Sequence, residues 1–172
     1  MIDGGCSAQR RSLLAAAVAA AVLAGCGFQL REAPHFAFTT IHVGASPNST
    51  VANEFRRSIA SGGNVALVDA ARIDSAQVVL DVLTEQREKV VVGLNASGQV
   101  REFQLRTRLK FRLRTPQGKE LIPETELLQQ RDISFNESAV LAKEAEENLL
   151  YRDMQTDIVQ QLMRRLAAIK SI

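Results

Sequence analysis

Apolar and polar residues alternate most regularly from Val100 to Arg114, and this stretch predicts a long β-strand. Successive strand side chains point to opposite faces, so one face of this strand belongs to the core and the other is cationic. The apolar face carries Phe103, Leu105, Leu109, Phe111 and Leu113, and the basic face carries Arg106, Arg108, Lys110, Arg112 and Arg114.

A hairpin is expected directly after this strand. The stretch from Thr115 to Lys119 fits a three-residue loop in which Pro116 opens a type I turn and Gly118 takes the left-handed position. Pro123 has no amide hydrogen to donate, so the returning strand lies at a sheet edge or contains a bulge. Continuing the hairpin register places Glu120, Glu124 and Glu126 opposite Arg114, Lys110 and Arg108.

The strongest helical pattern runs from about Ala139 to Ile169. Apolar residues recur there at every fourth position, which gives one stripe of the width that packs on a sheet. The stripe consists of Leu150, Met154, Ile158, Leu162 and Leu166.

The sequence between His35 and Leu94 shows shorter elements. We expect strands at His35–Val43 and Val65–Val68 and a helix from Thr50 to Ala60, with Ser49 or Thr50 as its N-cap. The stretches 77–83 and 89–94 predict one longer, bulged strand.

This order of elements predicts the fold class. It indicates a two-layer α+β domain over residues 35–172, with a mostly antiparallel or mixed sheet of four to five strands and two helices packed on one face.

The first residues have a different character. Arg10 and Arg11 precede the apolar run Leu13–Leu23, which has the length of a signal-peptide core and is short for a membrane-spanning helix. The small residues 24 and 25 then precede Cys26, in the order of a bacterial lipobox. We therefore expect a lipoprotein signal peptide at residues 1–25 and a lipidated tether at residues 26–34.

Cys26 is the expected lipidation site, carrying diacylglycerol and an N-acyl chain. Cys6 lies in the removed segment, so the mature chain has no second cysteine for a disulfide. More than one acyl chain makes membrane anchoring stable. Gly27 follows the cysteine in place of the aspartate that resembles an inner-membrane retention signal, which favours the outer membrane.

Several function classes are disfavoured by the sequence. His35 and His42 are the only histidines and project to opposite faces of one predicted strand, so they cannot share a metal. No phosphate-binding glycine loop or nucleophile elbow is present, which argues against an enzyme. One tyrosine, seven phenylalanines and no tryptophan leave few platforms for stacking nucleic-acid bases.

Two segments carry a resemblance to a known family. They are residues 26–31 (CGFQLR), at the lipidation site, and the stretch from Arg131 to Leu166, which includes the run Leu141-Ala142-Lys143. Together they resemble the LptE family of lipopolysaccharide-assembly lipoproteins across most of the mature chain.

The resemblance implies a partner role and a candidate binding site. Proteins of this family plug the lumen of the β-barrel LptD, help it assemble, and take part in delivering lipopolysaccharide to the outer leaflet of the outer membrane. A basic residue at the position of Lys143 is implied to bind lipopolysaccharide. The second basic residue of the family, in the turn before the long strand, has no match in residues 95–98. Arg101, or the basic face made by Arg106, Arg108, Lys110, Arg112 and Arg114, could supply that charge instead.

Structural explanations stand beside these functional ones. The basic face can be a solvated surface that is half neutralised by the neighbouring strand. Lys143 can simply pair with Glu147 one helical turn on. The alternative function is an envelope scaffolding lipoprotein that binds no glycolipid.

Overall fold

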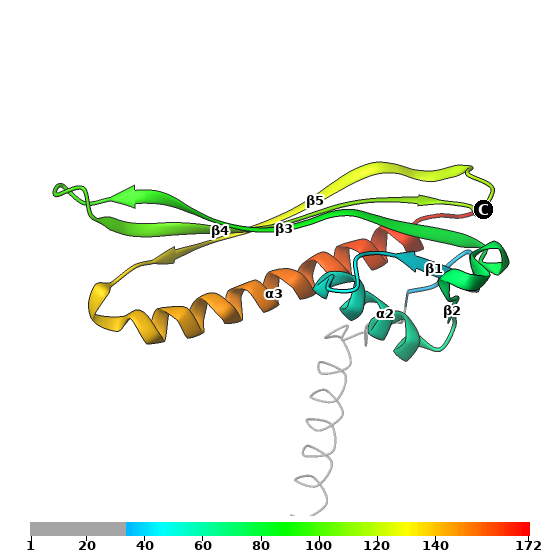
Figure 1. Ribbon diagram of the computed structural model, residues 1–172, viewed down its shortest axis with the longest axis horizontal. Helices are drawn as coiled ribbons and strands as arrows, with labels where there is room; N and C mark the ends of the chain where they lie inside the picture. Colours follow the sequence, from blue (N-terminus) through cyan, green and yellow to red (C-terminus); the bar gives the residue numbers. More distant parts are fainter. Residues whose placement is uncertain (1–33) are drawn as a thin grey trace, which may run out of the picture. The chain divides into compact units, whose positions relative to one another are not determined.

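A five-stranded sheet with the strand order β2-β1-β3-β4-β5 forms one layer of the protein, and helices α2 and α3 lie together on one side of it (Figure 1). The computed structural model describes residues 34–172, so the expected signal peptide, Cys26 and all but the last residue of the expected tether lie outside the described residues. The strands are β1 Thr40–Gly44, β2 Ala66–Leu67, β3 Val78–Leu94, β4 Val100–Arg114 and β5 Glu120–Ser134. The helices are α2 Thr50–Gly62 and α3 Val140–Ala167, with short 3-10 turns η1 Ala70–Ser75 and η2 Glu137–Ala139. The predicted α+β class, strand number and helix placement are confirmed.

The sheet is mixed. β1 runs parallel to both of its neighbours, β2 and β3, whereas β3, β4 and β5 form an antiparallel meander. The expected long strand with a bulge is β3, whose register shifts between Val82 and Thr84 and again between Val91 and Gly93. None of the helices among residues 34–172 is both long and apolar enough to cross a bilayer.

The predicted first strand is too long. The strand begins at Thr40 rather than His35. Phe38 is nevertheless buried, and its ring lies 5.2 Å from that of Phe36. The apolar spacing of Phe36 and Phe38 therefore reflects packing against the core by a segment that is not part of a strand.

Local signals for α2 and for the turns are confirmed. Ser49 caps α2, because its hydroxyl accepts the amide of Ala52 at 3.0 Å. Gly63 ends the helix with φ of 70°, and Gly118 takes the left-handed position of the β4–β5 turn with φ of 95°. Thr115 pairs with Lys119 across that turn, since the Thr115 amide donates to the Lys119 carbonyl at 2.8 Å.

Two apolar clusters lie between the sheet and the helices. The larger cluster fills the space under β1, the start of β3, the end of β4 and the second half of α3, and includes Phe55, Leu80, Phe111, Ile158 and Leu162. The smaller cluster lies nearer the β3–β4 turn and consists of Leu105, Ile133, Tyr151 and Met154. The predicted helical stripe of α3 spans both clusters.

Candidate functional sites

The basic stripe, defined as Arg106, Arg108, Lys110, Arg112 and Arg114, lies on the sheet face opposite the helices. The intervening residues Leu105, Leu109, Phe111 and Leu113 are fully buried under that face, so the predicted division of β4 into a core side and a cationic side is confirmed. Ion pairs connect the stripe to both neighbouring strands. Arg108 reaches Glu126 at 3.5 Å, Lys110 reaches Glu124 at 3.7 Å, and Arg112 and Arg114 both reach Asp81 at 2.9 and 2.8 Å.

The predicted hairpin register is correct at the turn and wrong further along. Arg114 lies opposite Glu120 as expected, but Lys110 lies opposite Glu126 and Arg108 lies opposite Leu128. Bulges in β5 around Ile122 and Thr125 insert extra residues and shift the register by two. A shift of two preserves the face, so the glutamates still reach the expected cations diagonally.

The predicted hairpin register places no acidic residue opposite Arg112, and the structure supplies its acidic partner, Asp81, from β3. Burial alone would raise the pKa of Asp81, but hydrogen bonds and charge from Arg114 and Arg112 outweigh it and hold the pKa below its ordinary value. Arg106 forms no ion pair with a described residue, and its Nε donates to the Gln104 side chain at 2.8 Å. Most of the stripe is therefore neutralised within the sheet.

A second cationic site lies on the helix side of the sheet. We call it the lysine pocket, a cavity of about 80 Å³ lined by Lys89, Phe103, Ile133, Ser134, Phe135, Val140, Lys143, Glu144 and Glu147. Lys89 comes from β3 and Lys143 from the first turn of α3. The Lys89 ammonium lies 4.4 Å from the centre of the Phe103 ring, which meets the Phe135 ring edge-on at 5.5 Å.

The two lysines have separate acidic partners. Lys143 donates to the Ser134 hydroxyl at 2.9 Å and to Glu146 at 2.8 Å. The expected pairing of Lys143 with Glu147 is therefore wrong, because Glu147 is bound by Lys89 at 2.6 Å. An ammonium has three donors, so neither lysine is saturated by these contacts.

Arg101 lies at the same end of the protein as the lysine pocket. It lines a neighbouring cavity of about 230 Å³ with Gln99, Val100, Phe135, Asn136 and Ser138. Phe135 lines both cavities, and its amide donates to the Arg101 carbonyl at 2.8 Å. The structure thus brings Arg101 and Lys143 into one region and leaves Arg106, Arg108, Lys110 and Arg112 on the other face.

Exposed apolar side chains accompany the lysine pocket. The β3–β4 hairpin and the start of α3 lie at the same end of the protein (Figure 1). Leu141 is 82% exposed, and the other large apolar residues exposed in these two segments are Val91, Val92, Leu94, Val140 and Leu149. This end therefore combines ammonium groups with open apolar surface.

Lys89 is the candidate that sequence reasoning missed. In the sequence it is a polar residue at the start of an apolar run, which gives no sign of its partner. Its register opposite Leu105 places it on the helix side, where Glu147 of α3 meets it. The β3–β4 register would have placed Lys89 on the helix side. That register depends on a bulge in β3 whose position the sequence predicts only approximately.

Metal chemistry has no support in the described part of the chain. Residues 34–172 contain no group of three histidine, cysteine or acidic side chains that could hold a metal ion. His42 instead binds the Val68 carbonyl through Nδ1 at 2.8 Å.

Comparison with known proteins identifies the family of the chain. The profile of the lipopolysaccharide-assembly family LptE matches residues 38–166, most of the chain. The chain belongs to the LptE family. It therefore belongs among the proteins of lipopolysaccharide assembly, a family without enzymatic activity.

Individual relatives cover most of the chain. The LPS-assembly lipoprotein LptE of Pectobacterium atrosepticum is 27% identical over 155 residues, covering 88% of this chain and 82% of that protein. The solution structure of lipoprotein B from Nitrosomonas europaea is 33% identical with a TM-score of 0.72, covering 83% of this chain and 91% of that one. The crystal structure of rare lipoprotein B from Shewanella oneidensis, at 24% identity, shares the fold with a TM-score of 0.64, covering 76% of this chain and 95% of that one.

Proposed function

We propose that this LptE-family chain is an outer-membrane lipoprotein, anchored through lipid on Cys26, that plugs the LptD β-barrel and binds lipopolysaccharide at the lysine pocket. The observation that carries the binding proposal is that Lys89 and Lys143 line one cavity beside exposed apolar residues. Lipopolysaccharide presents phosphates next to acyl chains, and this end of the protein offers the complementary pair of chemistries.

The lysine pocket is favoured over the basic stripe because its cations lie beside the exposed apolar residues of the β3–β4 hairpin and the start of α3. Four of the five stripe cations are held by acids from β3 and β5, which supports the structural explanation for those residues. The lysines also have one acidic partner each, and they remain partly exposed, 38% for Lys89 and 23% for Lys143. A phosphate can add to them without breaking a sheet ladder, since both ammoniums have spare donors.

The barrel partnership is supported by the polarity of the other sheet face. The basic stripe and the acids paired with it form a mixed-charge surface, which suits the polar interior of a large outer-membrane barrel. Recovery of LptD with this chain from detergent-solubilised outer membranes tests the partnership. Mass spectrometry of the mature N-terminus, showing acyl chains on Cys26, tests the anchor.

Retention of the purified chain on immobilised lipopolysaccharide tests the binding site. Replacing both lysines (Lys89→Gln with Lys143→Gln) should weaken retention by at least about tenfold, because one hydrogen bond to a charged group contributes about 1.5 kcal/mol or more. The matched control, Arg108→Gln with Lys110→Gln, removes the same charge from the stripe and should leave retention nearly unchanged.

Added salt should weaken binding of the unmodified chain, because the attraction is electrostatic. Equal losses of retention in both double variants would indicate that the basic stripe also binds lipopolysaccharide. Absence of retention by the unmodified chain would favour the scaffolding lipoprotein that binds no glycolipid.

A further inference from the structure

β3 has a free edge that begins where β1 ends. β1 pairs only with the segment from Val78 to Asp81, and its last residue, Gly44, lies beside Asp81. From Val82 to Leu94, β3 has β4 on one side and none of the described strands on the other. An unpaired edge offers a row of amides and carbonyls to another strand.

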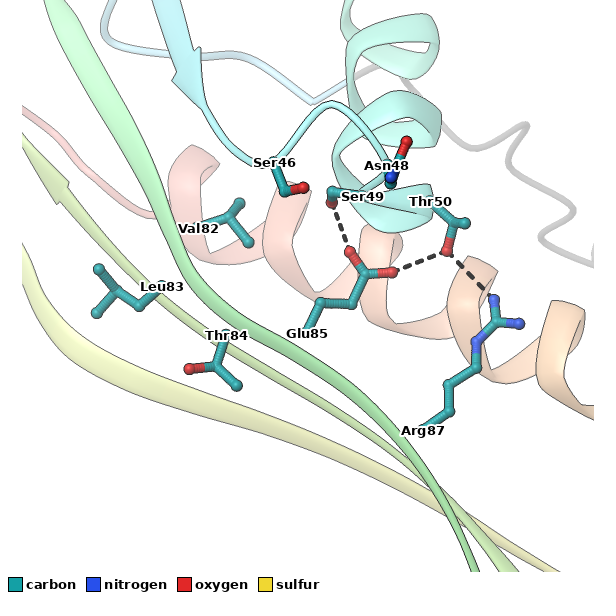
Figure 2. A pocket seen from close by; sticks show the side chains of 9 residues that line it. All are labelled: Ser46, Asn48, Ser49, Thr50, Val82, Leu83, Thr84, Glu85 and Arg87. Carbon is teal, nitrogen blue, oxygen red and sulfur yellow. Dashed lines mark hydrogen bonds between the residues drawn. The ribbon is translucent and has the colours of Figure 1, made fainter.

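A groove lies at the start of this free edge. It is a cavity of about 450 Å³, within the size range of ligand-binding pockets. One wall is the loop after β1 and the start of α2, and the other wall is β3 (Figure 2). The lining residues are Ser46, Asn48, Ser49, Thr50, Val82, Leu83, Thr84, Glu85 and Arg87.

Hydrogen bonds at the two ends of β4 show which β3 amides face the groove. The Thr115 amide donates to Lys119, and the Arg101 carbonyl accepts from Phe135, so the odd-numbered β4 residues face β5. The even-numbered residues then face β3, where Lys110 and Arg108 lie opposite Thr84 and Gln86. The backbone groups of Glu85 and Arg87 consequently point away from β4, into the groove.

The walls of the groove are fixed by side-chain hydrogen bonds. The Glu85 carboxylate accepts from the hydroxyls of Ser49 and Thr50, the latter at 2.8 Å (Figure 2). It also accepts from the Val51 amide at 3.3 Å. Arg87 donates to Thr50 at 3.2 Å and to Gln155 of α3 at 2.7 Å. A groove held in this way costs little to organise when a ligand enters.

The groove covers the first part of the free edge. It begins at Val82, where β1 ends beside Asp81, and runs to Arg87, about 20 Å of extended chain, which is the length of an ordinary strand. Beyond it, the Tyr151 hydroxyl of α3 donates to the Glu88 carbonyl at 2.8 Å from the helix side of the sheet, a contact that leaves the strand edge open.

We propose that this groove binds an extended segment of a partner polypeptide, which adds to β3 as a strand in line with β1. Only a peptide backbone supplies donors and acceptors at the spacing that the edge amides of Glu85 and Arg87 require. Side chains of the added strand that point toward the helices would meet Val82 and the hydroxyls of Ser46 and Ser49, so small polar or β-branched residues fit best.

A second copy of this chain does not fit when the two groove segments pair antiparallel about their centres. Two antiparallel copies centred on the groove would place residues 78–81 of one beside residues 88–91 of the other. The first copy's own β1 already occupies that side of its residues 78–81. The partner must therefore offer an extended segment whose edge facing β3 is unpaired.

Peptide selection on the full chain in detergent micelles tests this proposal. Phage-displayed peptides of about eight residues are selected, and the enriched peptide is studied by residue-resolved hydrogen exchange. The Glu85 and Arg87 amides should become protected by about tenfold or more, while the Gln86 amide, already bonded to β4, should change little.

Proline variants separate backbone from side-chain effects. Arg87→Pro and Arg87→Ala both remove the side chain that helps to fix the groove wall, but only Arg87→Pro also removes the groove-facing amide. Arg87→Pro should therefore bind the peptide about tenfold more weakly than Arg87→Ala does. The matched control is Gln130→Pro on β5, at a residue whose carbonyl faces the other sheet edge and accepts from Arg131 at 2.9 Å. This control should bind normally.

Three outcomes would overturn the proposal. Protection of β5 amides in place of Glu85 and Arg87, equal binding by Arg87→Pro and Arg87→Ala, or a dimer of the chain that Arg87→Pro dissolves would each contradict it. If Arg87→Pro does not fold, the exchange pattern of the unmodified chain still decides. Lipopolysaccharide retention is measured separately at the lysine pocket, so the two proposals fail independently.

Discussion

The two ends of the sheet differ in how their apolar residues are used. At the β1 end, the larger cluster is buried against α2 and the second half of α3. At the hairpin end, the smaller cluster has four buried members, and Leu94 and Leu141 stand in solvent at 61% and 82% exposure. The comparison indicates that one end supplies the stability of the fold and the other end keeps apolar surface available for binding.

The largest effect is expected from shortening a core side chain at the β1 end. Phe111 is fully buried in the larger cluster, so Phe111→Ala should lower the free energy of unfolding by about 3–5 kcal/mol. Urea denaturation measures this change. Val91→Ala, at a half-exposed residue of the hairpin end, is the control and should change stability by less than about 0.5 kcal/mol. Similar losses in both variants would remove the contrast between the ends.

Met154→Ala tests the smaller cluster. Met154 is fully buried beside Leu105 and Tyr151, and its truncation should cost about 2–3 kcal/mol, less than Phe111→Ala because fewer neighbours surround it. Hydrogen exchange should accelerate at Leu105 more than at Leu113. Uniform acceleration along β4 would show that the two clusters unfold as one unit.

Asp81 tests how the cations of the stripe are held at the β1 end. Its pKa is lowered in the folded state, so its contribution to stability is present above the unfolded pKa of about 3.9 and is lost as pH falls through the folded value. Asp81→Asn should therefore destabilise by about 1–2 kcal/mol at neutral pH, and the difference should shrink on acidification.

Unfolding free energies measured at several pH values check the Asp81 prediction. Asp69→Asn removes a highly exposed carboxylate that pairs with Arg72, and this control should have little effect at any pH. A pH-independent loss in Asp81→Asn would mean that packing, and not charge, is responsible.

The smallest effect on stability is expected at the most exposed leucine. Leu141→Ser should change the free energy of unfolding by less than about 0.5 kcal/mol. If acyl chains rest on this end, the same change should weaken lipopolysaccharide retention by about 1 kcal/mol. Leu67→Ser, at a half-exposed leucine of β2, is the matched control, and an equal loss of retention there would argue against a role specific to the hairpin end.

The antiparallel part of the fold could be predicted from sequence because its patterns are local. Strict alternation defined β4, the Pro116–Gly118 turn defined the hairpin, and four-residue spacing defined α3. The turn η1 at Ala70–Ser75 was not predicted because it buries no residue and so leaves no periodic signal.

The candidate site was predictable only in part. Lys143 was named from the family resemblance, and the structure adds Lys89 as its neighbour in the lysine pocket. That neighbour depends on register across bulges in β3, and an inserted residue reverses the face of every residue beyond it. The partner of Arg112 was missed for a related reason, since Asp81 lies on a strand whose pairing no local pattern specifies.

The order of strands in space also has a consequence for how the chain acquires its shape. β3, β4 and β5 meet through tight turns, whereas β1 must wait for a strand that lies beyond α2 and η1 in the sequence. Contacts between near neighbours form sooner than distant ones. We therefore expect the meander to assemble early and β1 with α2 to dock late, so that the edge groove exists only in the finished molecule and a half-folded chain has no walled site to offer a partner.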